Sequence, residues 1–114
     1  MAENKLADLS TDFAVSVLKL TENIKGHYSL CNQLERSGTS IGANIRESKY
    51  AHSKADFVSK LQIALKEANE TGYWLELLYK TVYINEETYK SLDSSCTSLR
   101  VMLIASINTA KDNK

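Results

Sequence analysis

The sequence predicts an all-α fold, an antiparallel up-down four-helix bundle in a single domain over residues 1–114. The chain contains no proline and only four glycines, whereas β-rich folds use more of both in turns. Apolar residues recur at steps of three and four along four long segments, as on one face of a helix. Short breaks separate the segments, and short connections make consecutive helices antiparallel. Two long helical hairpins that pair only in a dimer also fit these observations.

The first helix is predicted over roughly residues 4–25, and Gly26 ends it because glycine readily adopts the left-handed conformation. Its apolar face consists of Leu6, Leu9, Phe13, Val17, Leu20 and Ile24. The second helix is predicted over roughly residues 28–52. Its seam has small or polar residues in alternate layers: Cys31, Leu34, Gly38, Ile41, Ile45 and Ser48.

The third helix is predicted over roughly residues 54–83, after an N-cap at Ser53 with Asp56 as its capping-box partner. A heptad pattern defines its seam: Phe57, Leu61, Ala64, Ala68, Thr71, Leu75, Leu78 and Val82. The fourth helix is predicted over roughly residues 86–110, with Asn85 as N-cap. Its seam consists of Tyr89, Leu92, Cys96, Leu99, Leu103 and Ile107.

The charge is balanced, with 14 basic and 14 acidic residues and no basic tail. Proteins that bind duplex nucleic acid through phosphates usually carry a basic excess, so the balance argues against this use by a lone monomer. The chain shows neither an apolar signal segment at its start nor a stretch of membrane-spanning length. We therefore expect a cytoplasmic protein without a membrane partner.

The sequence gives no indication of catalysis. Cys31 and Cys96 lie far apart in apolar stripes, which favours two small reduced core residues, with a disulfide as the alternative. The histidines, His27 and His52, lack the glutamate three residues earlier that di-iron bundles require. We expect no catalytic residue, no metal site, no cofactor and no small-molecule substrate.

An unusual polar stretch covers residues 36–48 of the second predicted helix. Serine, threonine, asparagine and glycine are poor residues for a helix interior. Four polar side chains lie one residue ahead of the apolar seam, and Arg36, one turn before Ser40, can join them. We call these five residues the polar ledge: Arg36, Ser37, Ser40, Asn44 and Glu47. Glu67 and Glu70 of the third helix are suitable acceptors for Arg36 or Arg46, and Gly38 and Gly42 leave room for another backbone. The pattern predicts a subunit interface with a polar network that includes Glu70; a weak, solvated helix surface is the alternative.

The fourth predicted helix is apolar nearly all round between Leu99 and Ile107. One seam does not use all of these residues, and a helix that is apolar on every side is buried on every side. In a domain of this size the pattern indicates a partner chain, while a wide core stripe is the alternative. The aromatic residues Tyr73, Trp74, Tyr79 and Tyr83 support the first interpretation, because tyrosine and tryptophan are enriched at interfaces.

A second hypothesis concerns the most basic part of the chain, residues 46–66. The candidate contacts to RNA or DNA are Arg46, Lys49, Lys54, Lys60 and Lys66. A solvated face whose charge is balanced elsewhere is the alternative. The sequence thus supports a non-enzymatic homo-oligomeric scaffold first and a nucleic-acid-binding accessory protein second.

The same polar stretch carries a family resemblance that extends over nearly the whole chain and is densest at residues 36–78. The chain resembles a bacterial four-helix-bundle family whose members are often encoded within intervening sequences of 23S ribosomal RNA genes. The matching positions are Arg36, Ser37, Ser40, Ile41, Asn44, Ile45, Glu47, Ala64 and Glu70. The resemblance implies an up-down bundle that assembles into a homo-oligomer, typically a pentamer.

The resemblance also extends to the accessory variability protein of diversity-generating retroelements. That relative is a basic pentameric bundle that works with a reverse transcriptase and nucleic acid. The present chain departs from it because its formal net charge is zero. The resemblance therefore implies self-association as the main partnership and leaves nucleic acid as the alternative partner.

Overall fold

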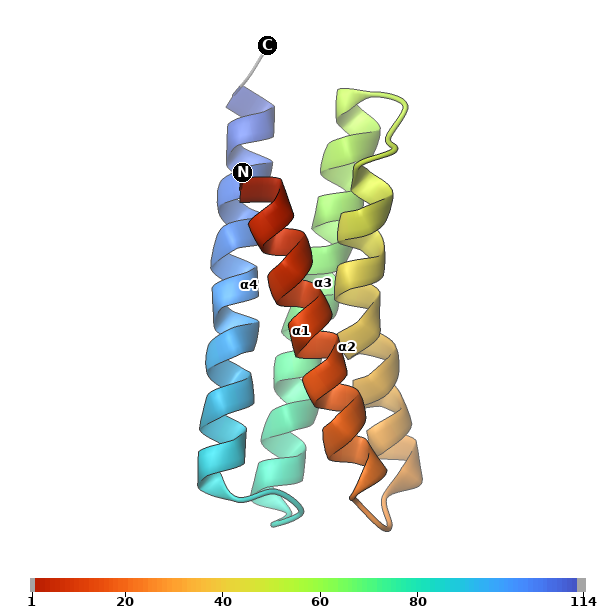
Figure 1. Cartoon of the computed structure of the whole chain (residues 1–114), viewed down its shortest axis with the longest axis vertical. Helices are drawn as coiled ribbons and strands as arrows, with labels where there is room; N and C mark the ends of the chain where they lie inside the picture. Colours follow the sequence, from red (N-terminus) through yellow and green to blue (C-terminus); the bar gives the residue numbers. More distant parts are fainter. Residues whose placement is uncertain (1, 113–114) are drawn as a thin grey trace.

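Four antiparallel helices form an up-down bundle in the computed structural model, which describes residues 2–112, with side chains from residue 5 onward (Figure 1). Their bounds are α1 Ala2–Glu22, α2 Tyr28–Ser48, α3 Lys54–Lys80 and α4 Glu86–Asp112. The bundle measures 48 × 21 × 19 Å. The predicted all-α four-helix fold is confirmed. None of the four helices is long and apolar enough to cross a membrane.

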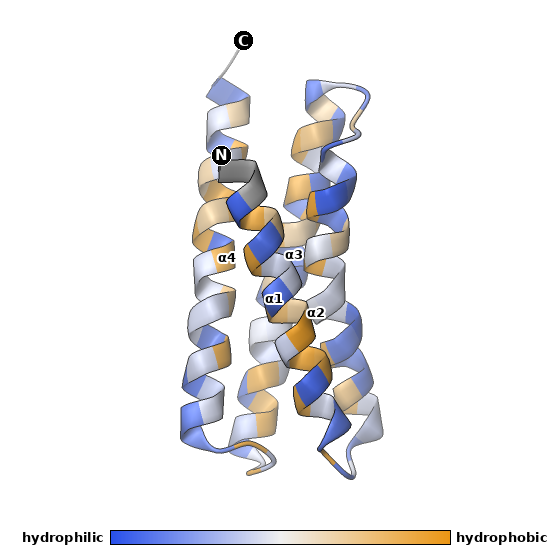
Figure 2. Cartoon of the chain, in the orientation of Figure 1, coloured by the Kyte–Doolittle hydropathy of each residue, from blue (hydrophilic) through white to orange (hydrophobic). Residues whose placement is uncertain are grey.

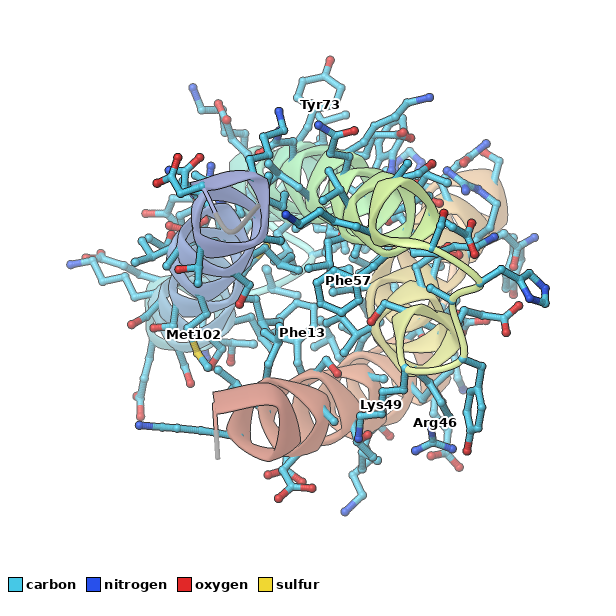
Figure 3. The ribbon with its side chains drawn as sticks, turned by 90° about the horizontal axis from the view of Figure 1, so that it is seen from above. Phe13, Arg46, Lys49, Phe57, Tyr73 and Met102 are labelled. Atoms are coloured by element: carbon cyan, nitrogen blue, oxygen red, sulfur yellow. The ribbon has the colours of Figure 1, made fainter. Side chains whose placement is uncertain are left out.

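The helix α1 lies obliquely across the bundle. Figures 1 and 3 show its N-terminal end beside α4 and its C-terminal end beside α2. It packs on both of these helices, while α3 packs on α2 and α4. Two surface grooves of about 450 and 390 Å³ lie along the seam between α1 and α4. Of the four packed pairs of helices among the described residues, α1 and α4 share the least extensive contact.

Three helices, α1, α2 and α3, end earlier than the sequence pattern predicts. The first stops at Glu22, and a turn leads to Gly26 (φ 96°) and His27 (φ 45°), both in the left-handed region. The second stops at Ser48, because the next three amides donate to the carbonyl oxygens three residues earlier rather than four. Such tight bonds are typical of helix ends. Gly26 thus lies in the predicted connection but four residues beyond the end of α1.

The predicted N-caps of α3 and α4 are present. The Ser53 hydroxyl accepts a hydrogen bond from the Asp56 amide at 3.1 Å, and the Asp56 carboxylate accepts one from the His52 amide at 3.3 Å. In a standard capping box the Asp56 carboxylate would accept from the amide of the N-cap, Ser53, whereas here it accepts from the preceding amide, that of His52. The Asn85 side chain accepts from the Thr88 amide at 2.8 Å. These bonds satisfy amides that have no partner within their own helix.

The end of α3 shows where the heptad pattern misleads. The Val82 amide donates to the Tyr79 carbonyl at 3.0 Å, and the Tyr83 amide donates to the Leu78 carbonyl at 2.9 Å. This pair of bonds is a Schellman motif, which needs a left-handed residue at the position of Val82 (φ 66°). Val82 was predicted to lie in the core seam, but it has left the helix and is 86% exposed.

The core is built from one stripe of each helix, mostly as the periodicity predicts. Figure 3 shows Phe13 and Phe57 pointing into the space between the helices. Phe57 is only half-buried, and Val58 beside it is the buried residue. The largest fully buried apolar side chains are Leu34, Ile41, Leu61, Leu75, Leu78, Leu99 and Leu103.

Both cysteines are free and buried, as predicted. The Cys96 thiol donates a weak hydrogen bond to the Ala68 carbonyl at 3.2 Å. Burial raises the pKa of Cys96 from 9.0 to about 11, although the nearby Arg100 opposes this shift. Burial and the charge of Glu35 also raise the pKa of Cys31. Both environments favour the protonated thiol, so neither cysteine is activated as a nucleophile.

Candidate functional site

A cluster of ion pairs joins the polar ledge of α2 to α3. Arg36 Nη1 lies 3.0 Å from Glu67 Oε2, and its Nη2 lies 3.0 Å from Glu70 Oε1. The Arg36 Nε donates to Gln33 Oε1 at 3.3 Å. The sequence left open whether Arg36 or Arg46 pairs with Glu67 and Glu70, and in the structure Arg36 pairs with both. Within residues 5–112, no group of three or more His, Cys, Asp or Glu side chains is placed to hold a metal ion.

Ser37 belongs to the interior of the subunit. It is fully buried, as is Thr71 of α3, whose hydroxyl donates to Ser37 Oγ at 2.8 Å. The pair bridges α2 and α3 within an otherwise apolar layer, where an unpaired hydroxyl costs about 1–3 kcal/mol. Because α3 of the same chain covers Ser37, this residue does not reach a second subunit. The prediction that Ser37 lies in a subunit interface is therefore wrong, and Ser37 belongs to a hydrogen-bond network inside the subunit.

The remaining residues of the polar ledge lie further out. Ser40 donates to the Arg36 carbonyl at 2.6 Å, and Asn44 donates to the Ser40 carbonyl at 2.9 Å. Both side chains are half-buried, and Glu47 is exposed. Their hydrogen bonds run along α2 itself. The outer part of the polar ledge therefore remains accessible at the surface of one subunit.

The two glycines of α2 mark the close contact with α1. A Cβ at Gly38 would lie 3.3 Å from both methyl carbons of Val17, and a Cβ at Gly42 would lie 3.2 Å from Ser10 Oγ. The sequence predicted that another backbone approaches this strip, and the nearest atoms are the side chains of Val17 and Ser10. The approaching helix is α1 of the same chain, however, and not a helix of another subunit.

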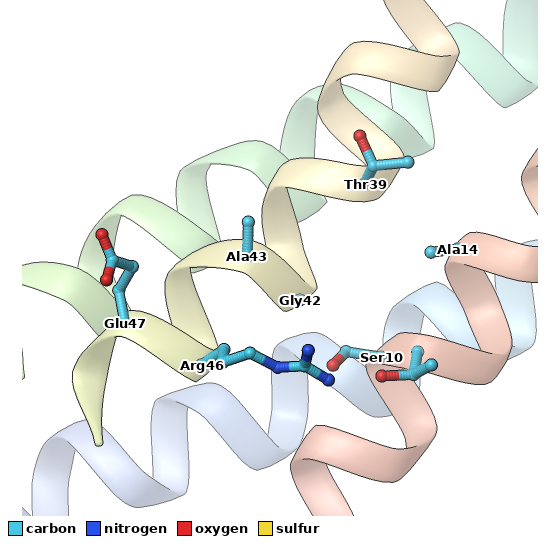
Figure 4. Close-up of a pocket in the computed structure, with 8 residues that line it drawn as sticks. Ser10, Ala14, Thr39, Gly42, Ala43, Arg46 and Glu47 are labelled. Carbon is cyan, nitrogen blue, oxygen red and sulfur yellow. The ribbon is translucent and has the colours of Figure 1, made fainter. Parts of the chain in front are cut away.

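Beside this contact, α1 and α2 separate and leave a surface groove of about 500 Å³ (Figure 4). Its lining residues are Ser10, Thr11, Ala14, Thr39, Gly42, Ala43, Arg46 and Glu47. Figure 4 shows the guanidinium group of Arg46 extending toward Ser10 of α1, with Glu47 directed elsewhere. Sequence reasoning missed this groove, because it did not bring the hydroxyl residues of α1 to the polar side of α2.

The five predicted nucleic-acid contacts do not form one patch. In α3, Lys54, Lys60 and Lys66 are spaced by six residues, and each such step turns the helix by about 240°, so they point in three directions. Arg46 in the last turn of α2 and Lys49 just after its end both lie on the side toward α1 (Figure 3). Within the described part of the chain, none of the five forms an ion pair with a carboxylate.

The surplus apolar residues of α4 face outward. Val101 is 61% exposed and Ile104 is 46% exposed, whereas Leu99, Leu103 and Ile107 are buried. Figure 2 shows hydrophobic residues gathered in the C-terminal half of α4. The alternative of a wide core stripe is therefore wrong for Val101 and Ile104.

The predicted set of exposed aromatic residues divides in a similar way. Tyr73 is 55% exposed and Trp74 is half-buried. Tyr79 instead stacks on Tyr89 of α4, with ring centroids 4.6 Å apart and an interplanar angle of 3°. Only some of these rings therefore face outward, and the exposed side chains on α4 carry the stronger indication of a partner.

Comparisons with known proteins agree with this architecture. A family model described as "23S rRNA-intervening sequence protein" matches residues 2–105. A crystal structure from Bacteroides thetaiotaomicron, of a protein with unknown function from the S23 ribosomal protein family, superimposes with a TM-score of 0.92. It shares 49% sequence identity, and the alignment covers 95% of this chain and 99% of that one. No curated protein matches the chain. The match over residues 2–105 shows that the chain belongs to the family of 23S rRNA-intervening sequence proteins.

Proposed function

We propose that this protein is a non-enzymatic scaffold that acts as a homo-oligomer, with a ring of five subunits as its form. The supporting observation is the outward-facing pair Val101 and Ile104 on α4, which are 61% and 46% exposed. Apolar residues gathered on one helix face, beyond what the core needs, are typical of protein interfaces. Ring closure at five subunits rests on the family resemblance.

The contact we propose joins two different surfaces. The outward face of α4 in one subunit meets the outer polar ledge of α2 in the next, at Ser40, Asn44 and Glu47. A contact between unlike surfaces is head-to-tail, and it closes into a ring when the rotation between subunits allows. The half-buried Ser40 and Asn44 would supply hydrogen bonds that fix the register, while Val101 and Ile104 would supply apolar contact area.

Light scattering on the purified protein at micromolar concentration tests this assembly. We expect an oligomer for the native protein, and a shift to monomer when Val101 and Ile104 are both replaced with aspartate. Burying two unpaired carboxylates in the contact weakens it by more than about tenfold. Val82→Asp is the matched control, because Val82 is an exposed valine in the α3–α4 connection. A native protein that is monomeric throughout would contradict the proposal.

The second candidate function is binding of RNA or DNA by the assembly. Arg46, Lys49 and Lys54 lie around the α2–α3 connection without ion pairs to the described carboxylates, and Tyr50 among them is 77% exposed. Exposed cations beside an aromatic ring suit a phosphate backbone with unstacked bases. The family description refers to a 23S rRNA intervening sequence, which makes RNA the first nucleic acid to test.

A gel shift with a salt titration tests this candidate. Replacing Arg46, Lys49 and Lys54 with glutamine should weaken binding at low salt and flatten its salt dependence, because each phosphate contact releases counterions. Replacing Lys80 and Lys90 with glutamine is the control, since these lysines already pair with Glu76 and Glu86. Absence of any shift at low salt would rule the candidate out.

A further inference from the structure

The groove between α1 and α2 has the chemistry of a ligand site and lies within one subunit. We propose that it binds a small oxyanion, a phosphate or carboxylate, on a carbon skeleton that carries hydroxyl groups. Every residue that carries the argument belongs to one subunit, although Glu47, which lines the groove, is also part of the subunit contact proposed above. The groove has a volume of about 500 Å³, within the range of about 300–1,000 Å³ typical of small-ligand sites.

The positive charge at the groove comes from Arg46. Arg36 is held by Glu67 and Glu70, but Arg46 pairs with no carboxylate of residues 5–112. Its guanidinium group extends across the groove toward Ser10, while Glu47 is directed elsewhere (Figure 4). A guanidinium group in this state offers several N–H donors to an incoming oxyanion, and phosphate or carboxylate matches its planar geometry.

The hydroxyl groups along the groove supply acceptors. Ser10 and Thr11 both donate to the Ala7 carbonyl at 2.9 Å, and Thr39 donates to the Glu35 carbonyl at 2.7 Å. A hydroxyl has one proton and two lone pairs, so all three oxygens retain lone pairs after these bonds. A ligand that meets them must bring its own O–H or N–H donors.

Small residues keep the groove open. Ala14 of α1 and Ala43 of α2 line it with methyl groups only, and Gly42 contributes no side chain. The close contact at Gly42, where a Cβ would lie 3.2 Å from Ser10 Oγ, fixes the spacing of the two helices beside it. The groove is thus a recess bordered by one cation, Arg46, and three hydroxyl oxygens, while the carboxylate of Glu47, which also lines it, is directed away from Arg46 (Figure 4). This arrangement selects a hydroxylated anion over a bare anion or a neutral polyol.

Isothermal titration at low ionic strength tests the site with four probes. Ribose 5-phosphate carries a phosphate and hydroxyl donors, and gluconate carries a carboxylate and hydroxyl donors. The probe that binds more tightly identifies the preferred anion. Inorganic phosphate has the oxyanion without the carbon skeleton, and ribose has the hydroxyl groups without the anion. Each should bind at least about tenfold more weakly than the combined probes. Binding of inorganic phosphate as tight as that of ribose 5-phosphate would overturn the role of the hydroxyl oxygens.

Three variants locate the binding. Arg46→Gln should weaken it at least about tenfold, the effect expected for loss of a charge-assisted pair. Ala43→Leu should block it by filling the groove without changing charge, at an exposed helix position that tolerates leucine. Lys49→Gln removes an exposed cation one turn away that does not line the groove, and it should leave binding unchanged. Equal losses in Arg46→Gln and Lys49→Gln, or no binding of any probe, would overturn the proposal.

Discussion

Replacing Gly38 with leucine is expected to lower the free energy of unfolding by about 3 kcal/mol, the upper end for overpacking a filled core. Gly38 is buried, and its added Cβ would already lie 3.3 Å from both Val17 methyl carbons. The larger side chain must push α1 away from α2 along this contact. Urea denaturation followed by circular dichroism measures the loss directly.

Gly72 provides the matched control, because it is also a glycine in the middle of a helix. A Cβ there meets nothing within 4 Å. Replacing Gly72 with leucine should therefore raise the free energy of unfolding by about 0.5–1 kcal/mol, the helix propensity that glycine lacks. If both variants shifted stability in the same direction by similar amounts, the close α1–α2 contact would be disproved.

The second large effect concerns pH. The thiol of Cys96 has a pKa of about 11 in the folded protein against a reference value of 9.0. Because the folded state holds this proton more tightly, the stabilisation is complete below pH 9 and is lost as the pH rises toward 11. A difference of two pKa units corresponds to about 2–3 kcal/mol. Unfolding free energies measured at pH 8 and above pH 11 should show this loss.

The variant Cys96→Ala isolates the thiol from other groups that titrate in alkali. Tyrosines and lysines titrate in the native protein and in the variant alike, so their contributions cancel in the comparison. The variant should start from a lower stability at neutral pH, because a small cavity replaces the sulfur. Its further loss between pH 8 and pH 11 should be smaller by about 2–3 kcal/mol. Parallel curves for the two proteins would contradict the burial argument.

Helix periodicity was sufficient to predict the fold, but not the helix ends. Seams such as Leu34, Ile41 and Ile45 are buried as predicted, because a repeat of three and four residues leaves one face for a core. Val82 continues the heptad in sequence, yet its amide completes a Schellman motif outside α3. Heptad spacing carries no information about a left-handed residue when that residue is not glycine.

The sequence predicted several residues of the candidate site, but not which helix packs against each of them. Arg36 finds Glu67 and Glu70 because α2 and α3 are antiparallel and consecutive, which sequence order alone implies. Gly38 also packs closely against a helix, as predicted, but the sequence did not identify that helix as α1. The groove at Arg46 depends on the oblique path of α1, which arises from packing of the whole bundle. Periodicity fixes which residues face inward and leaves open which helix covers them.

The seam between α1 and α4 is the one packed pair of helices, among residues 2–112, that is not consecutive along the chain. The other three pairs close over short connections, so their loop-closure entropy is small. Joining α1 to α4 instead encloses two whole helices, and the contact between α1 and α4, the least extensive of the four, offsets less of that cost. The topology therefore favours rapid folding of the consecutive helical hairpins, and the contact between α1 and α4 should form last. The same contact should open first in native-state fluctuations.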